Sequence, residues 1–369
     1  MRLFINATSA RTGGGVTHLT WLLHGLAKIG SELEILVLTT SSPPERLTGL
    51  PPTFRVYPHP ADTWPLARRL IWEQTQLPRM IKRWGADTYL SFGSFGLLHS
   101  PCPQVMICAQ PLYFSERYYK EFAVKNRRLL LEEIGRRALL KATARRANRI
   151  LTQTDAMRRQ IVLQLGVPAE RISVIPHGIH GSFLTDDEGR TTEDQHPESA
   201  LPSSVDRHPS SAQRSVLYVS VHQVHKDFDT LVRAAAIMRR QEPSDLRFLF
   251  TGNPNDNQFS RATGDLVREL GLEETVHFVG LVPNDQIHSL YRSADVFAFP
   301  SWAETFGIPL VEAMACGLPI VAADIEVNRE VAADAAVYHT VSDPAPLASQ
   351  LNRLLTDSAL RTRLATVGR

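Results

Sequence analysis

The chain has 369 residues, of which 43% are hydrophobic and 21% charged, and its 40 Lys+Arg against 38 Asp+Glu leave a formal charge of +2. This composition excludes a fibrous or disordered protein, and the length predicts two domains, because one hydrophobic core seldom grows past about 250–300 residues. Dedicated nucleic-acid binders usually carry a strong basic excess, so the charge argues against that class.

Short apolar runs alternate with amphipathic segments along the first half of the chain, which is the pattern of a parallel α/β sheet. The predicted strands of this half span 2–7, 33–39, 54–57, 88–91, 104–108, 149–153 and 172–175. The helices predicted between them span 16–29, 64–84, 115–147 and 156–165.

The second half repeats this pattern after a change in composition. Residues 185–214 are rich in Ser, Thr, Pro, Asp, Glu and His and hold almost no large apolar side chain, which is typical of an insertion without a core of its own. Predicted strands follow at 215–220, 246–251, 275–279, 295–300, 319–323 and 336–339. Predicted helices follow at 229–240, 259–270, 285–293, 309–315, 327–331, 346–355 and 358–366. We therefore predict domains at 1–176 and 215–369, joined by a crossover and insertion at 177–214.

The small net charge hides two opposite halves. Residues 1–175 carry a net +12 and residues 176–369 a net −10. Much of the positive charge lies between Lys125 and Arg149, where Glu132 and Glu133 are the only acids. This stretch suits anionic lipid head groups, but a solvated helix face that pairs with acidic neighbours explains it equally well. Its basic residues are Lys125, Arg127, Arg128, Arg136, Arg137, Lys141, Arg145, Arg146 and Arg149.

Cysteines and targeting signals are sparse. Cys102, Cys108 and Cys316 are an odd number without CxxC spacing, so neither a disulfide framework nor a structural zinc site is predicted. The N-terminus lacks the apolar stretch of about 7–15 residues that a secretory signal needs. No run approaches the roughly 20 apolar residues of a membrane span. The chain is predicted to be cytoplasmic or peripheral to a membrane.

A glycine-rich turn, Thr12-Gly13-Gly14-Gly15-Val16, follows the first predicted strand. Consecutive glycines let backbone N–H groups approach an anion, and a helix N-terminus favours negative charge. The dinucleotide fingerprint GxGxxG is not met, because His18 stands at the third glycine position. A plain tight turn therefore remains an alternative to an anion site.

Two carboxylates follow the predicted strand 295–300. Glu304 lies in the loop after it, and Glu312 lies in a helix for which Pro309 suits the first position and Gly317 the end. Open α/β sheets bind ligands at the carboxyl ends of their strands, and carboxylates there accept hydrogen bonds from hydroxyls. The alternative is a helix cap beside a surface acid. Backbone N–H groups that can receive phosphate oxygens are those around Phe306, Gly307 and Ile308.

These residues resemble the E-x7-E motif of the retaining family-four glycosyltransferases, also called glycosyl transferases group 1. The resemblance runs along nearly the whole chain and is specific for the family rather than for one sugar. It also includes Lys226 and the stretches 13–15, 149–157, 174–178, 217–220, 278–280 and 292–297. It implies an α/β fold of the GT-B type, in which two Rossmann-like, doubly wound domains face each other across a cleft.

The resemblance implies transfer of a hexose from a UDP- or GDP-sugar to a glycan or lipid-linked acceptor in cell-surface polysaccharide biosynthesis, without cofactor or metal. Glu304 is expected to orient the sugar hydroxyls, and Lys226 to bind the donor diphosphate as a point charge. Glu312 is expected to hold the ribose hydroxyls. The other expected donor-binding residues are Gly14, Gly15, Phe306, Gly307 and Ile308 at the phosphates, and Gly280 and Leu281 near the base.

Three features depart from the family pattern. Val221 stands where members usually carry an Arg, so that diphosphate contact is missing or comes from His222 or His225. Gln110 stands where many relatives place a His near the acceptor, and an amide cannot act as a base. The sequence ends at Arg369, where relatives usually continue into a helix that crosses back onto the first domain.

Two alternatives stay open. One is a nucleotide-sugar epimerase, which shares the same fold. The other, which the missing Arg and the short C-terminus allow, is a catalytically weak or inactive module that binds a nucleotide sugar or a lipid surface. The expected partners are the nucleotide-sugar donor, the glycan or lipid-linked acceptor and an anionic surface at the inner face of the membrane, with no nucleic acid.

Overall fold

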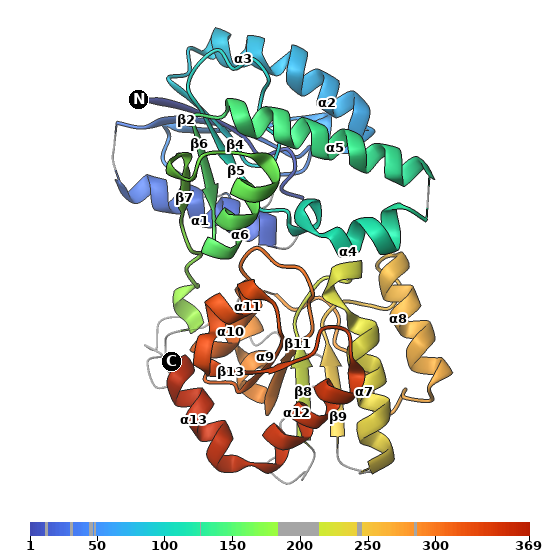
Figure 1. Ribbon diagram of the computed structural model, residues 1–369. Helices are drawn as coiled ribbons and strands as arrows, with labels where there is room; N and C mark the ends of the chain where they lie inside the picture. Colours follow the sequence, from blue (N-terminus) through green and yellow to red (C-terminus); the bar gives the residue numbers. More distant parts are fainter. Residues whose placement is uncertain are drawn as a thin grey trace. The chain divides into compact units, whose positions relative to one another are not determined.

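The computed structural model describes all residues except 12–13, 30–31, 44–46, 48, 126, 184–213, 242–245 and 284–285, and the side chains at 127 and 128. The described residues form two compact units, Met1–His177 and Gly178–Arg369, each built around a parallel sheet (Figure 1). Most of the predicted insertion, 184–213, lies outside the described residues.

The first unit has a seven-stranded sheet in the order β3-β2-β1-β4-β5-β6-β7, and all seven predicted strands are confirmed. The strands are β1 (Arg2–Asn6), β2 (Glu34–Thr39), β3 (Phe54–Pro58), β4 (Thr88–Ser91), β5 (Gln104–Ile107), β6 (Arg149–Thr152) and β7 (Ile172–Val174). Alternate side chains of β1 enter two cores. Leu3 and Ile5 pack with residues of α1 (Gly14–Ile29), whereas Phe4 packs with residues of α3 (Leu77–Trp84).

Two long helices predicted in the first unit are divided, and this corrects the expectation. The stretch 64–84 forms α2 (Leu66–Thr75) and α3, because Pro78 lacks the N–H that would continue the hydrogen bonding of α2. The stretch 115–147 forms α4 (Glu116–Tyr118), a π-helical turn η4 (Tyr119–Ala123) and α5 (Arg127–Arg146). The remaining elements are η2 (Pro60–Thr63), η3 (Pro111–Phe114), α6 (Asp155–Gln160), η5 (Ile161–Leu165) and η6 (Ala169–Arg171).

The second unit has a six-stranded sheet in the order β10-β9-β8-β11-β12-β13, and its predicted strands are confirmed as well. They are β8 (Arg214–Tyr218), β9 (Leu246–Phe250), β10 (Val276–Phe278), β11 (Val296–Phe299), β12 (Ile320–Ala323) and β13 (Ala336–His339). The helices are η7 (Gly181–Phe183), η10 (Val224–Lys226), α7 (Phe228–Gln241), α8 (Gln258–Glu269), α9 (Ile287–Ser293), α10 (Ile308–Ala315), α11 (Glu326–Ala332), η11 (Ala333–Ala335), α12 (Pro344–Thr356) and α13 (Ser358–Gly368).

Two neighbouring strands of the second sheet are completely buried. Every residue of β11 and of β12 is buried, as a parallel sheet requires when helices cover both of its faces. Figure 1 shows the helices of this unit around the sheet. None of the helices in the described part of the chain combines the length and apolar character needed to cross a membrane.

Candidate functional site

The second sheet reverses its strand order between β8 and β11. From β8 the chain builds outward through β9 and β10, and from β11 it builds the other way through β12 and β13, while β8 and β11 pair with each other. Loops that leave such a pair of strands diverge and form a crevice where ligands bind. Lys226 follows β8 and Glu304 follows β11, so the fold brings together two predicted site residues that are 78 positions apart.

Lys226 and Glu304 form an ion pair at this switch point. The distance from Lys226 Nζ to Glu304 Oε1 is 2.6 Å, and the two side chains are only 14% and 8% exposed. A charge-assisted hydrogen bond of this kind is short and strong because little water screens it. The pair places a cation, which can hold a phosphate, next to a carboxylate, which can hold a hydroxyl.

A buried tyrosine fastens the two loops that carry this pair. The Tyr218 hydroxyl donates to the Lys226 carbonyl at 2.7 Å and lies 3.0 Å from the Ser301 hydroxyl. The backbone N–H of Trp302 donates to the His225 carbonyl at 3.0 Å. Sequence reasoning assigned Tyr218 no role, although a tyrosine closing an otherwise apolar strand signals that its hydroxyl needs a buried partner.

The stretch 306–308 leads into the N-terminus of α10. Gly307 has φ +84°, and a Cβ there would lie 3.1 Å from Leu310 Cδ1 and 3.3 Å from the Phe299 ring, so a glycine is required. No side chain caps α10. The first N–H groups of the helix, at Gly307 and Ile308, therefore have the polarity to receive an anion, while the Phe306 side chain is buried.

Glu312 lies in the second turn of α10 and is held by a neighbouring helix. Its Oε2 accepts a hydrogen bond of 2.8 Å from the hydroxyl of Tyr291 on α9. Burial raises the pKa of the Glu312 carboxyl, and this hydrogen bond lowers it. Tyr291 is a second site residue that sequence reasoning missed, and the same signal, a tyrosine within a buried helical face, marks it.

The two histidines after β8 are buried and held neutral. His222 is 3% exposed and stacks on Phe228 with the ring centroids 3.7 Å apart, and burial lowers its pKa to about 4. Burial and the adjacent Lys226 lower the pKa of His225 well below its usual value. Neither imidazole therefore supplies at pH 7 the positive charge that is missing at Val221. A neutral imidazole can only offer a hydrogen bond.

The residues expected near the base lie at the same edge of the sheet. Gly280 follows β10, where its carbonyl accepts a hydrogen bond of 2.8 Å from the N–H of Gly252 after β9. Leu281 is 79% exposed. Because β9 lies between β10 and β8, Gly280 is two strands away from the switch point.

In the first unit, the sheet reverses its order between β1 and β4. α1 begins at Gly14, two residues earlier than predicted, so Gly14 and Gly15 form the first turn of this helix rather than a loop. Residues 12 and 13 of the glycine turn lie outside the described residues. Gln110, at the carboxyl end of β5, caps η3 through a hydrogen bond of 3.5 Å from the Leu112 N–H.

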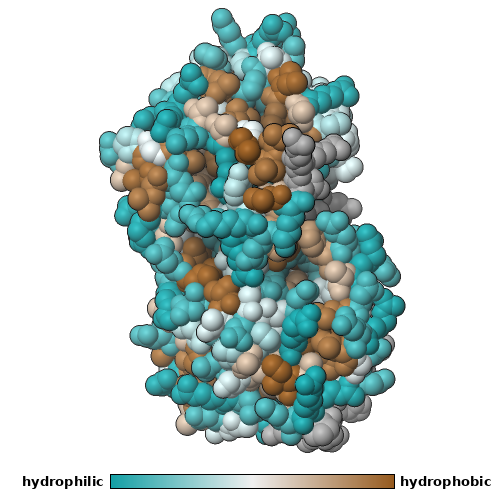
Figure 2. All heavy atoms as spheres, turned by 45° about the vertical axis from the view of Figure 1, so that its right-hand side comes forward, coloured by the Kyte–Doolittle hydropathy of each residue, from teal (hydrophilic) through white to brown (hydrophobic). Residues whose placement is uncertain are grey.

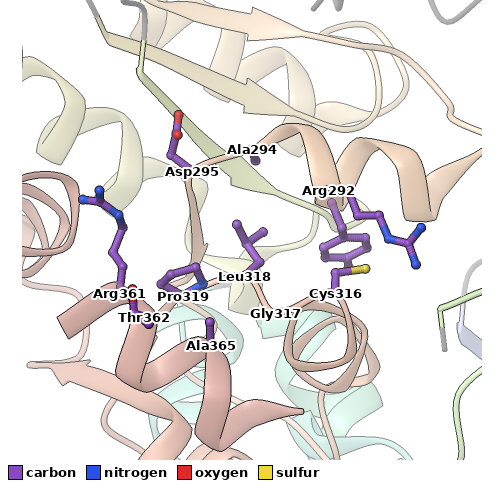
Figure 3. Close-up of a pocket in the computed structure, with 11 residues that line it drawn as sticks. Arg292, Ala294, Asp295, Cys316, Gly317, Leu318, Pro319, Arg361, Thr362 and Ala365 are labelled. Atoms are coloured by element: carbon purple, nitrogen blue, oxygen red, sulfur yellow. The ribbon is translucent and has the colours of Figure 1, made fainter. Parts of the chain in front are cut away.

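A separate pocket of about 290 Å³ lies in the second unit (Figure 3). Asp295 and Pro319, which line it, precede β11 and β12, so the pocket lies at the amino ends of these strands. Glu304 lies beyond the opposite, carboxyl ends. The pocket is therefore not the predicted site, although Tyr291 borders both the pocket and Glu312.

Within the described residues, no group of three or more His, Cys, Asp or Glu side chains is arranged to hold a metal ion. Cys102, Cys108 and Cys316 are free thiols. Burial raises the pKa of Cys108 to about 12 and that of Cys316 to about 11, so both stay protonated at neutral pH.

Two family models match the chain, one over each unit. The model described as Glycosyltransferase Family 4 matches residues 12–182, and the model described as Glycosyl transferases group 1 matches residues 205–369. Among curated proteins, D-inositol 3-phosphate glycosyltransferases are similar. That of Nocardia farcinica is 32% identical over 241 residues, which are 64% of this chain and 49% of the relative. That of Salinispora arenicola is 30% identical over 231 residues, 59% and 49% of the two chains.

Solved structures resemble the whole chain at low sequence identity. Sucrose-phosphate synthase from Thermosynechococcus elongatus has a TM-score of 0.76 at 18% identity, with 100% of this chain and 93% of that chain covered. HepE from Anabaena in complex with UDP-glucose has a TM-score of 0.71 at 19% identity, with the same coverage. These likenesses establish the fold. The matches to the curated relatives span about half of those proteins' length or less.

Proposed function

Because the chain belongs to the family-four, group 1 glycosyltransferases and has their two-unit GT-B fold, we propose that it transfers a hexose from a nucleotide-diphosphate sugar to a glycan or lipid-linked acceptor. The observation that carries this proposal is the pairing of Lys226 with Glu304 at the sheet's switch point, where α/β sheets bind their ligands. UDP-glucose is the first donor to try, since the structurally similar HepE was solved with it.

The residues divide the chemistry between them. Transfer breaks the bond between the anomeric carbon and an oxygen of the β-phosphate. Negative charge therefore builds on the leaving diphosphate and positive charge on the sugar. Lys226 and the first N–H groups of α10 stabilise the diphosphate, and this supplies the positive charge for which other enzymes use a metal. Glu304 accepts hydrogen bonds from the sugar hydroxyls, and Glu312 accepts them from the ribose. We propose a retaining, front-face attack in which the leaving phosphate helps to take the acceptor proton.

The acceptor is proposed to be presented at the inner face of a membrane, in the assembly of a cell-surface polysaccharide. The support is the net +12 of residues 1–175, which suits a lipid-linked or otherwise anionic acceptor. The second unit, with its negative charge, would take the donor through the local cation and helix N-terminus described above.

The proposal is tested by donor binding followed by transfer. UDP-glucose, GDP-mannose and ADP-glucose are screened for a rise in melting temperature, and the donor that binds is then used with a radiolabelled sugar on extracted lipid-linked acceptors. We expect one donor to stabilise the protein and Glu304→Ala to lower transfer by about 100-fold or more, as the loss of a group at the reacting carbon does. Glu273→Ala, at an exposed acid outside the site, is the matched control. Wild-type transfer by Glu304→Ala would contradict the assignment.

A second candidate is a module that binds a nucleotide sugar without turning it over. Val221 favours it, because this position is 44% exposed and uncharged, and its two histidine neighbours are neutral. The diphosphate then meets one cation, Lys226, in the loop after β8. Calorimetric binding of the donor together with no transfer to any acceptor would support this alternative.

A further inference from the structure

The ion pair between Lys226 and Glu304 has a consequence for ligand binding that depends on the proposed function. Lys226 is the only cationic side chain in the loop 219–227, and it is already engaged by a carboxylate at 2.6 Å. A phosphate that uses Lys226 must therefore compete with Glu304, or share the lysine with it.

Hydrogen bonds tie the loop that carries Glu304 to the loop that carries Lys226. Tyr218 bonds both loops, through the Lys226 carbonyl at 2.7 Å and the Ser301 hydroxyl at 3.0 Å, and the Trp302 N–H bonds the His225 carbonyl. Glu304 itself is 9% exposed, so water screens its charge poorly. An anion at Lys226 therefore lies near a negative charge that water screens poorly.

The intact donor and the released nucleoside diphosphate differ in how they meet this charge. Transfer breaks the bond from the anomeric carbon to the β-phosphate oxygen, forms a bond from that carbon to the acceptor oxygen, and passes the acceptor proton to phosphate or water. The diphosphate that is left has a terminal phosphate with a further ionisation near pH 6, so it carries about one more negative charge than the donor. It has also lost the sugar hydroxyls.

We propose that Glu304 makes the site prefer the intact nucleotide sugar over the nucleoside diphosphate product. With the donor bound, Lys226 binds the diphosphate instead of Glu304. The sugar hydroxyls then donate hydrogen bonds to Glu304 in place of the lysine. With the product bound, the carboxylate has no such hydroxyls and faces an additional negative charge. A buried carboxylate without a partner beside an anion is unfavourable, so the product leaves.

The test compares two substitutions, each of which replaces one carboxylate of the candidate site by an amide. Calorimetry measures the Kd of wild type, Glu304→Gln and Glu312→Gln for UDP-glucose with UDP, and for GDP-mannose with GDP. We expect Glu304→Gln to bind the nucleoside diphosphate about tenfold more tightly than wild type, because Lys226 is released and the repulsion is lost. Its affinity for the nucleotide sugar stays level or falls, so the preference for the donor shrinks or inverts. Glu312→Gln, which loses a ribose contact common to both ligands, weakens both equally.

The outcomes separate the two proposals. If wild type binds a nucleotide sugar and Glu304→Gln keeps the wild-type ratio of the two affinities, the inference about product release is wrong while the proposed function stands. If wild type binds none of these four ligands and none of the nucleotide sugars of the melting-temperature screen, the proposed function fails and this inference falls with it. Tighter product binding by Glu304→Gln also shows that the variant is folded, so a loss of structure cannot imitate the expected result.

Discussion

At the scale of single residues, the site depends on hydroxyl groups that hold its charged side chains. Tyr291 is fully buried between Phe183 and Phe297, with ring centroids at 5.9 and 5.4 Å, so its hydroxyl has a fixed direction. That hydroxyl donates to Glu312 Oε2 and opposes the rise in carboxyl pKa that burial causes. Tyr291 is thus a positioning residue for the carboxylate proposed to hold the ribose.

We predict that Tyr291→Phe raises the KM for the donor about tenfold and changes kcat less. A hydrogen bond to a charged group contributes about 1.5–3 kcal/mol. Since about 1.4 kcal/mol corresponds to a factor of ten in affinity, its loss should change binding by about tenfold or more. Without the hydroxyl the pKa of Glu312 rises further, so the acidic limb of kcat/KM moves to higher pH. Steady-state kinetics across pH measure both effects.

Tyr338→Phe is the matched control for this prediction. The Tyr338 hydroxyl donates to the Ala333 carbonyl at 2.7 Å and has no contact with Glu312. The Tyr338→Phe variant should lose about 1 kcal/mol of unfolding free energy and keep the donor KM and the pH profile of the wild type. An unchanged KM in Tyr291→Phe would show that Glu312 does not depend on this hydroxyl.

At the scale of elements, the basic stretch that runs from Lys125 through α5 to Arg149 contains side chains that support the fold and others that face solvent. Arg136 pairs with Glu132 and Glu133, and Arg137 donates to the Ser115 carbonyl at 3.0 Å. Arg145 donates to Leu165, and Arg149 to Glu170, through backbone carbonyls. Lys125, Lys141 and Arg146 have no ion pair within the described part of the chain. Exposed apolar side chains accompany them at Val124, Leu131 and Ile134.

This division sharpens the hypothesis of an anionic membrane surface. Exposed apolar side chains lie near lysines without a described ion pair in α5 and in the turn before it, and this combination suits a lipid surface. The four arginines instead make contacts within the fold. Figure 2 shows one face of the molecule, on which hydrophobic and hydrophilic residues are intermingled.

We predict that Lys125→Ala/Lys141→Ala weakens binding to phosphatidylglycerol/phosphatidylcholine vesicles by about 30-fold. Each lysine near an anionic surface contributes about 1 kcal/mol, and roughly 1 M salt shortens the screening length to about 3 Å, which should abolish the difference. Vesicle co-sedimentation measures the binding. Lys82→Ala/Arg83→Ala, two exposed cations on α3, should bind as wild type does. Equal binding of wild type to pure phosphatidylcholine at high salt would refute the hypothesis.

At the scale of the whole molecule, both units hold neutral histidines, half-buried in the first unit and buried in the second. Burial lowers the pKa of His18 to about 3 and that of His177 to about 4, and their rings meet at 4.3 Å in the first unit. In the second unit, burial likewise lowers the pKa values of His222 and His225. The unfolded chain protonates such residues near pH 6.5, whereas the folded chain resists protonation down to about pH 4. Their contribution to stability is therefore present above pH 6.5 and is lost as the pH falls.

We predict that the melting temperature falls by several degrees between pH 6.5 and pH 4. Each such histidine removes up to about 1.4 kcal/mol of unfolding free energy per pH unit in this range, because the unfolded state binds the proton that the folded state refuses. Glu73 and Glu312, whose pKa values burial raises, act in the opposite sense and offset part of the loss. Calorimetric melting across pH measures the sum.

A variant isolates the histidine contribution. His18→Gln should make the dependence of melting temperature on pH shallower. The variant has one fewer histidine that takes up a proton in the unfolded state but not in the folded state. His99→Gln, at an exposed histidine, should leave the slope unchanged. A slope that is identical in His18→Gln and wild type would mean that His18 takes up its proton in the folded state.

Much of the candidate site followed from the sequence because its signals are local. One short stretch holds Glu304, Gly307 and Glu312. In it, an apolar strand, a turn with glycine and a helix that begins at a proline can each be recognised from the residues alone. The contacts of these residues were not local. The Lys226 ion pair, the Tyr218 bridge between two loops and the Tyr291 hydrogen bond each join segments that no periodicity relates. His222 is neutral because it is buried, and the burial of this side chain could not be predicted from the sequence.

The sequence by itself determined the strands, most of the helices and the existence of two α/β units, because alternation and apolar periodicity record how each segment faces a core. Only the tertiary structure decided the order of the strands, and with it the switch point between β8 and β11 that brings Lys226 to Glu304. Strand order depends on which segments bury each other best across the whole chain. The π-helical turn η4 within the stretch 115–147 was likewise seen only in the structure, whereas Pro78, which ends the hydrogen bonding of α2, stands in the sequence. The sequence thus named the charged groups, and the fold determined what each of them meets.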